Sequence, residues 1–176
     1  MDVDGVWHGV HPHPVRRDRG DLVISSVVYM PDGTEGFEQL LAKKISDIEF
    51  EICCIPGYSY GLSLGDVVKT RPRGGKTFVV SEVLRSSGHS TFRIWFGDRA
   101  PGGPAAEATQ SVLAEVVGAG FLTEWCSPSY VAIDASPSVD VAAISGVLEN
   151  LEKRGLIESY EVGKGPFHEL VGVGMG

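Results

Sequence analysis

The feature that most constrains the fold of this chain is a change of hydrophobic pattern near Gly97. Before it, short apolar runs follow one another with no helix-like stretch between them. After it, strand-like runs alternate with two segments whose apolar residues recur at helical spacing. Such a chain is expected to combine a strand-only part with a part in which helices cover a sheet. The sequence therefore predicts an α+β protein.

The first half predicts strands that pair with their sequence neighbours. Leu22–Met30 is rich in β-branched residues and ends at a Pro-Asp-Gly turn. In Ile48–Ile52 apolar and acidic residues alternate, as in a strand with one buried face. Only two residues separate the run Phe37–Ile45 from the run Ile48–Ile55, so we expect these runs to form a hairpin.

Two later runs, Thr77–Arg85 and Thr91–Phe96, flank a short polar segment and predict a second hairpin. The basic segment Lys69–Arg73 is expected to be a solvated loop. Five to six short strands without helices favour a small, curved, strand-rich antiparallel sheet or partial barrel.

The second half predicts two helices packed on a sheet. One helix is expected over Ala105–Val117, and another begins near Ser138, a residue type that often caps a helix N-terminus. Counted with Thr91–Phe96, the order is strand, helix, strand, strand, helix, strand, which is typical of a ferredoxin-like βαββαβ sandwich. The other predicted strands are Phe121–Cys126, Tyr130–Ala135 and Leu156–Val162.

These patterns divide the chain into four segments. They are an N-terminal arm over 1–20, a strand-rich antiparallel β subdomain over 21–98, a ferredoxin-like α/β subdomain over 99–163 that shares strand 91–96, and a flexible C-terminal tail over 164–176. Prolines between closely spaced histidines disfavour a helix in the arm, which is expected to drape over the surface rather than join the core.

Composition favours some partners over others. The formal net charge is −8, whereas affinity for nucleic acid depends on Lys and Arg that neutralise phosphates. A protein partner or self-association is therefore expected, and a nucleic-acid partner is not. No run approaches the ~20 apolar residues of a membrane span, and the N-terminus lacks a secretory pattern, so a cytoplasmic location is predicted. No nucleotide-binding motif occurs, so no cofactor is expected.

The densest group of reactive side chains lies in the polar segment after Arg85. Here His89 could act as an acid or base and Ser90 as a nucleophile, with Asp66 orienting the histidine. The alternative is a structural turn, in which Gly88 takes a positive φ and the hydroxyls bond turn amides. No complete catalytic signature is present, so no catalytic residue is assigned.

A second group of candidates is aromatic, because Tyr58 and Tyr60 flank a glycine-rich loop and could wall a pocket together with Trp95. The candidate ligand- or partner-binding residues are Tyr58, Tyr60, Ser87, His89, Thr91, Arg93 and Trp95. No metal site is predicted. The weak candidate for one is the group His8, His11 and His13.

Several motifs together resemble a bacterial family known only as a domain of unknown function, number forty-two sixty-five in that series. The motifs are Ile55-Pro56, Tyr60-Gly61, Leu64–Val68 and Ser87–Thr91, with Arg93 and Phe96. The resemblance covers about residues 23–162, and the chain departs from the pattern at Cys53-Cys54. It implies a bacterial cytoplasmic domain and supplies no activity.

Two functions remain open. The favoured one is a non-enzymatic binding, regulatory or accessory protein, for example of the immunity type, that acts through protein or small-ligand contacts. The alternative is a small enzyme or small-molecule binder with a site on the Ser87–Thr91 hairpin. In that case His89 would be the acid or base, and Arg93 would anchor an anionic group.

Overall fold

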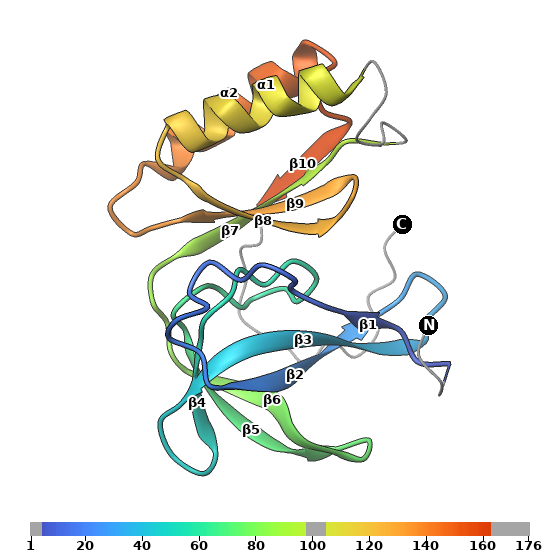
Figure 1. Cartoon of the computed structure of the whole chain (residues 1–176), viewed down its shortest axis with the longest axis vertical. Helices are drawn as coiled ribbons and strands as arrows, with labels where there is room; N and C mark the ends of the chain where they lie inside the picture. Colours follow the sequence, from blue (N-terminus) through green and yellow to red (C-terminus); the bar gives the residue numbers. More distant parts are fainter. Residues whose placement is uncertain (1–4, 98–104, 163–176) are drawn as a thin grey trace.

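The computed structural model describes residues 5–97 and 105–162 and shows two sheets, one above the other (Figure 1). The lower sheet has six strands and the upper sheet has four. Two helices cover the face of the upper sheet that points away from the lower one, and loops fill the layer between the sheets. The fold is mostly β with two short helices among the described residues, which confirms the predicted α+β class.

The lower sheet is mixed and nearly closes into a ring. Its strand order is β1-β3-β2-β6-β5-β4, and β3 also pairs with β4. The pairings β1–β3 and β2–β6 are parallel, and the others are antiparallel. The strands are β1 (His8–Gly9), β2 (Leu22–Tyr29), β3 (Glu35–Lys44), β4 (Glu49–Ile52), β5 (Val67–Arg73) and β6 (Lys76–Arg85). The ring encloses Ile24, Leu40 and Phe50, which are fully buried.

The predicted hairpin of β3 and β4 is confirmed. Ala42 lies opposite Ile52, and Lys44 lies opposite Phe50. The alternation also holds, because Phe50 and Ile52 are fully buried. Burial of one such side chain contributes about 1.5–3 kcal/mol to folding.

Two expectations about the following strands are wrong. Residues Lys69–Arg73 form the second part of β5 rather than a loop, because they pair with β6 across a turn at Gly74-Gly75. The runs around the polar segment do not form a hairpin, because β6 belongs to the lower sheet and β7 (Ser90–Trp95) to the upper one. The segment Ser86–His89 therefore carries the chain from one sheet to the other.

Strand β7 belongs to the upper sheet, where both of its faces are covered. Phe92, Ile94 and the following Phe96 pack against the helices, as the alternation predicts. On the opposite face, Thr91 and Arg93 are also buried, beneath the loops that separate the two sheets. A strand buried on both faces belongs in the interior of a sheet, and β7 lies between β9 and β10.

The upper sheet is antiparallel throughout, with strand order β10-β7-β9-β8. Its remaining elements are α1 (Ala105–Gly118), β8 (Leu122–Ser127), β9 (Tyr130–Ala135), α2 (Val141–Lys153) and β10 (Ser159–Val162). The N-cap of α2 is Asp140 and not Ser138, because the Asp140 carboxylate accepts a bond from the amide of Ala142 at 2.9 Å. Ser138 instead shares a hydrogen bond with Ser136.

The N-terminal segment is more deeply integrated than a surface arm. β1 adds to the edge of β3, where His8 lies opposite Phe37. The side chain of His11 is only 2% exposed. The predicted tail over 164–176 lies outside the described residues. Among the described helices, none is both long and apolar enough to cross a membrane.

Candidate functional site

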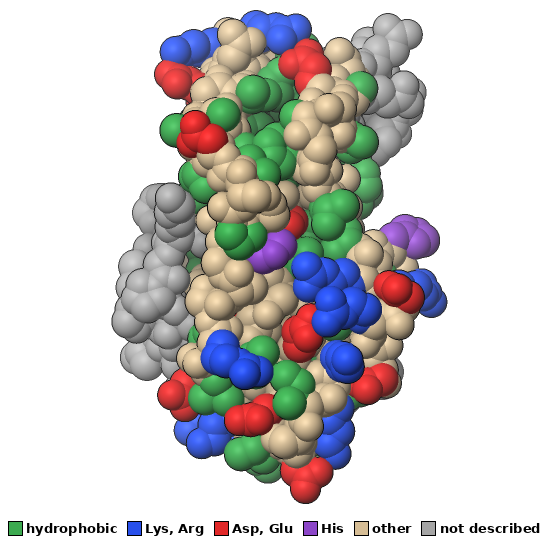
Figure 2. Space-filling model, turned by 90° about the vertical axis from the view of Figure 1, so that its left-hand side faces the viewer, with side chains coloured by type: hydrophobic (Ala, Val, Ile, Leu, Met, Phe, Trp, Pro, Cys, Tyr) green, Lys and Arg blue, Asp and Glu red, His purple; other side chains and the backbone are tan. Residues whose placement is uncertain are grey.

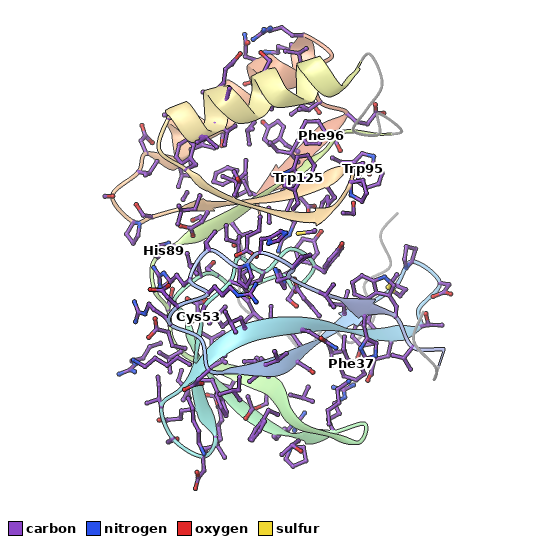
Figure 3. The ribbon with its side chains drawn as sticks, in the orientation of Figure 1. Phe37, Cys53, His89, Trp95, Phe96 and Trp125 are labelled. Atoms are coloured by element: carbon purple, nitrogen blue, oxygen red, sulfur yellow. The ribbon has the colours of Figure 1, made fainter. Side chains whose placement is uncertain are left out.

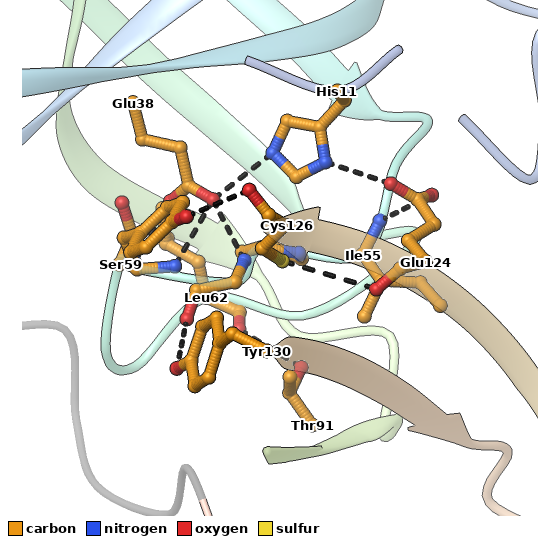
Figure 4. A network of polar contacts seen from close by, with 12 residues as sticks. His11, Glu38, Ile55, Ser59, Leu62, Thr91, Glu124, Cys126 and Tyr130 are labelled. Carbon is orange, nitrogen blue, oxygen red and sulfur yellow. Dashed lines mark hydrogen bonds and ion pairs between the residues drawn. The ribbon is translucent and has the colours of Figure 1, made fainter. Parts of the chain in front are cut away.

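The loop Pro56–Ser59 lies between the two sheets, and each sheet holds one side of its backbone. From the lower sheet, the buried carboxylate of Glu38 accepts bonds from the amides of Gly57 at 2.7 Å, Tyr58 at 3.1 Å and Ser59 at 2.7 Å (Figure 4). From the upper sheet, the buried guanidinium of Arg93 donates to the carbonyls of the same loop. Nε bonds the Gly57 oxygen at 2.5 Å, and Nη2 bonds the oxygens of Pro56 at 3.2 Å and Ser59 at 2.8 Å.

His11 joins the same network by bridging two buried carboxylates. Its Nε2 lies 3.0 Å from Glu38, and its Nδ1 lies 2.7 Å from Glu124 of β8. Carboxylate oxygens only accept hydrogen bonds, so both ring nitrogens must carry protons and the ring is an imidazolium. Burial alone would lower the pKa of His11, but the two carboxylates outweigh it and raise this pKa to about 9.

The hydrogen bonds of Glu38 and Arg93 to the loop Pro56–Ser59 fix one wall of a hollow of about 780 Å³ between the sheets. The hollow collects aromatic side chains from six segments of the chain: Trp7, Tyr29, Tyr58, Tyr60, Trp95, Tyr130 and Tyr160. The sequence contains three tryptophans, five tyrosines and seven phenylalanines. All of the tyrosines and all but one of the tryptophans line the hollow, while none of the phenylalanines within residues 5–97 and 105–162 does.

The tyrosine hydroxyls nearest the loop are engaged with protein groups. Tyr58 donates to the Cys126 carbonyl at 2.9 Å, Tyr130 donates to the Gly57 carbonyl at 2.8 Å, and Tyr60 donates to Glu161 at 2.6 Å. Burial raises the pKa of each of these hydroxyls, that of Tyr60 to about 12. These three tyrosines therefore stay neutral.

Among the described residues that line the hollow, the one cation is Arg93. Its guanidinium lies 4.5 Å from the centre of the Tyr60 ring, and its Nε lies 3.8 Å from the Glu161 carboxylate. The side chain is fully buried, and its Nη1 amino group has no hydrogen-bond partner among the described residues. A buried donor without a partner is uncommon in native proteins and calls for an explanation.

The candidate residues identified from the sequence separate into two groups. Tyr58, Tyr60, Arg93 and Trp95 come together in the hollow. The group around His89 does not join them, because His89 immediately precedes β7 and Trp95 is the last residue of that strand (Figure 3). Six residues of extended chain separate their Cα atoms by about 20 Å.

Around His89 the structure replaces one predicted partner with another. The Nδ1 of His89 lies 2.8 Å from Asp134 of β9. Asp66 instead accepts bonds from the amides of Ser63 and Ser87, both at 2.8 Å, so it does not orient His89. Ser90 pairs with Ala135 in the sheet.

The features expected of a structural turn are present in this segment. Gly88 has a φ of 78°. The hydroxyl of Ser86 accepts from the amide of Gly88, and that of Ser87 accepts from the amide of His89. Thr91 is fully buried and donates to the carbonyl of Leu62 at 3.4 Å. Within the described part of the chain, no hydroxyl or thiol bonds the His89 ring, so a positioned nucleophile is missing.

The three N-terminal histidines have separate environments. His8 lies 3.2 Å from the Gln39 side chain, His11 is held by its two carboxylates, and His13 is exposed. Across residues 5–97 and 105–162, no group of three or more His, Cys, Asp or Glu residues is placed to hold a metal ion.

Sequence reasoning missed Glu38, Glu124, Asp134 and most of the hollow. The carboxylates looked like ordinary polar residues of strands, because the partners of His11 are 27 and 113 residues away. One signal was available: tyrosine and tryptophan combine an apolar ring with a polar tip and gather at binding surfaces. The five tyrosines fall in loops and at strand ends, in the same segments that line the hollow.

Known proteins resemble this chain in sequence and in fold. A family model described as "Domain of unknown function (DUF4265)" matches residues 38–159. A solved structure described as a hypothetical protein from Neisseria gonorrhoeae is similar, with a TM-score of 0.65 and 20% sequence identity. The alignment covers 81% of this chain and 93% of that one, and at this identity the likeness concerns the fold alone. No curated protein matches.

Proposed function

The chain belongs to the DUF4265 family, whose description names no activity, and we propose that it is a non-enzymatic binding protein that acts through the aromatic hollow. The observation that carries this proposal is the gathering of seven of the eight tyrosines and tryptophans around one hollow. A volume of 780 Å³ falls within the range of about 300–1,000 Å³ typical of small-molecule sites.

Rigidity of the wall supports the proposal. Glu38 and Arg93 hold opposite sides of the loop Pro56–Ser59, which carries Tyr58 and leads directly to Tyr60. A site whose wall is already ordered loses less conformational entropy when a ligand binds. Because this ordered wall is lined by aromatic rings, the hollow is suited to a ligand with a flat, apolar body.

We also assign the upper half to the ferredoxin-like class. The strand order β10-β7-β9-β8, with one helix after β7 and one after β9, supports the assignment. Such folds host many functions, so this assignment alone selects none of them. Our proposal includes a regulatory or accessory role in the bacterial cytoplasm, in which the hollow contacts a small ligand or a protein partner.

The hydrogen bond of 2.8 Å between His89 and Asp134 favours the alternative of a small enzyme. A carboxylate on Nδ1 is how a catalytic histidine is commonly oriented. However, the intended anion anchor, Arg93, lines the hollow and bonds the carbonyls of the loop Pro56–Ser59, and no contact joins it to His89 among the described residues. The substitution His89→Ala should therefore leave ligand binding in the hollow unchanged, and a loss of binding would favour the alternative.

Nile red, a neutral flat aromatic dye that fluoresces in apolar surroundings, provides the test of the binding site. The matched variants are Trp95→Ala, which changes the hollow, and Trp125→Ala, which removes a comparably exposed indole outside it (42% and 37% exposed). We expect saturable binding that Trp95→Ala weakens about tenfold and Trp125→Ala leaves unchanged. Absence of saturable binding, or equal loss in the two variants, would overturn the proposal.

A further inference from the structure

The hydrogen-bonding capacity of Arg93 is only partly used. Nε and Nη2 donate to three loop carbonyls, and Nη1 donates to nothing among the described residues. An unpartnered buried N–H is costly because the group has lost its bonds to water. Arg93 lines the hollow, so a ligand there could supply the missing acceptor.

The charge of Arg93 is also only partly compensated. The carbonyls that it binds are neutral, and the carboxylate that pairs with it is that of Glu161. That carboxylate lies 3.8 Å from Nε, beyond ordinary hydrogen-bonding distance, is 43% exposed, and already accepts the Tyr60 hydroxyl at 2.6 Å. A buried cation is stable when a close anion faces it, and Glu161 meets this need incompletely.

The remaining wall offers few competing polar groups. The hydroxyls of Tyr58 and Tyr130 point to backbone carbonyls, and their rings lie with centroids 5.4 Å apart. Trp7 packs edge-on against Tyr58, with centroids 4.7 Å apart. Among the described lining residues, a ligand therefore meets mostly aromatic surface, together with one cation whose Nη1 lacks an acceptor.

From this juxtaposition, and resting on the proposed function, we infer that the hollow binds a flat aromatic carboxylate. The ring packs among the tyrosine and tryptophan side chains, and the carboxylate accepts from Nη1 of Arg93. A charge-assisted bond of this kind is roughly twice as strong as a neutral one, so the acid is preferred over its amide.

The test compares two ligands of the same shape, 2-naphthoate and 2-naphthamide, as competitors that displace Nile red. We expect the acid to displace the dye at about tenfold lower concentration than the amide. Arg93 is left unchanged, because its substitution would also release the loop Pro56–Ser59. The variant is instead Glu161→Gln, which removes the competing charge and keeps an oxygen for Tyr60.

Glu161→Gln is expected to tighten binding of the acid at least about threefold and to leave the amide unchanged. The control is Glu158→Gln, an equal change of charge at an exposed residue that does not line the hollow. If acid and amide displace the dye equally, or if neither does, the inference is wrong while dye binding keeps the proposed function. An acid preference that Glu161→Gln and Glu158→Gln alter equally also overturns it. Absence of dye binding overturns the inference and the proposed function together.

Discussion

At the scale of single residues, His11 has the largest predicted effect on stability. Burial alone would lower the pKa of His11, but the carboxylates of Glu124 and Glu38 outweigh it and raise this pKa from 6.5 to about 9. A group whose pKa is raised by folding stabilises the folded state fully below its unfolded pKa, and this contribution is lost as the pH rises through the folded pKa. The wild type should therefore lose a few kcal/mol between pH 6.5 and about 9, since one unit of pKa corresponds to about 1.4 kcal/mol.

Urea denaturation across this pH range measures the effect. His11→Gln should be less stable by about 3–5 kcal/mol at pH 6, because two buried carboxylates lose their cation. It should also lose the wild type's decline in stability above pH 6.5. His13→Gln is the control, since His13 lies in the same segment but is exposed. If the free energy of unfolding of His11→Gln fell as steeply with pH as that of the wild type, His11 would not be the buried imidazolium described above.

Gly57 gives a second prediction at this scale. A Cβ added there would overlap the sulfur of Cys126. Gly57→Ala should cost about 1–3 kcal/mol through overpacking. In a Gly57→Ala/Cys126→Ala double variant, the total cost should be smaller than the sum of the single costs, because the overlap is removed. Simple additivity of the free energies of unfolding would show that the two residues are not in contact.

At the scale of elements, the alternation along each strand was predictable, but the choice of partner was not. The faces of β7 follow from its sequence, because Phe92 and Ile94 alternate with Thr91 and Arg93. Its separation from β6 depends on the helices and loops that cover β7, and these come from distant sequence. The N-cap of α2 was misplaced for a similar reason, since Ser138 and Asp140 are both suitable caps and local geometry decides between them.

The segment that connects the sheets should be sensitive to its backbone geometry. Gly88→Ala places a side chain at a φ of 78°, with Cβ 3.1 Å from Pro137, and should destabilise the protein by about 1–2 kcal/mol. Gly146→Ala, at an exposed position in α2 with open space around it, should stabilise it by about 0.5–1 kcal/mol. Thermal denaturation distinguishes these opposite shifts in Tm. Equal shifts would mean that the conformation of Gly88 carries no cost.

At the scale of the whole molecule, charge is distributed rather than segregated. On the face shown in Figure 2, acidic and basic side chains lie next to one another, so the net charge of −8 is not concentrated there. The joint between the sheets, by which we mean the contacts that connect the lower sheet to the upper one, depends instead on buried polar contacts. Those contacts link residues from the N-terminal segment, β3, β7 and β8. Their long sequence separations explain why the order of elements was predictable while the joint and the hollow were not.

The central claim is that the hollow is a ligand site, and the three tryptophans test it directly. Trp7 and Trp95 line the hollow, whereas Trp125 packs beside Phe96 outside it. In ¹H–¹⁵N spectra recorded during titration with Nile red, the indole signals of Trp7 and Trp95 should shift along saturable curves while that of Trp125 stays in place. Movement of Trp125 alone, equal movement of all three signals, or no movement would contradict the claim.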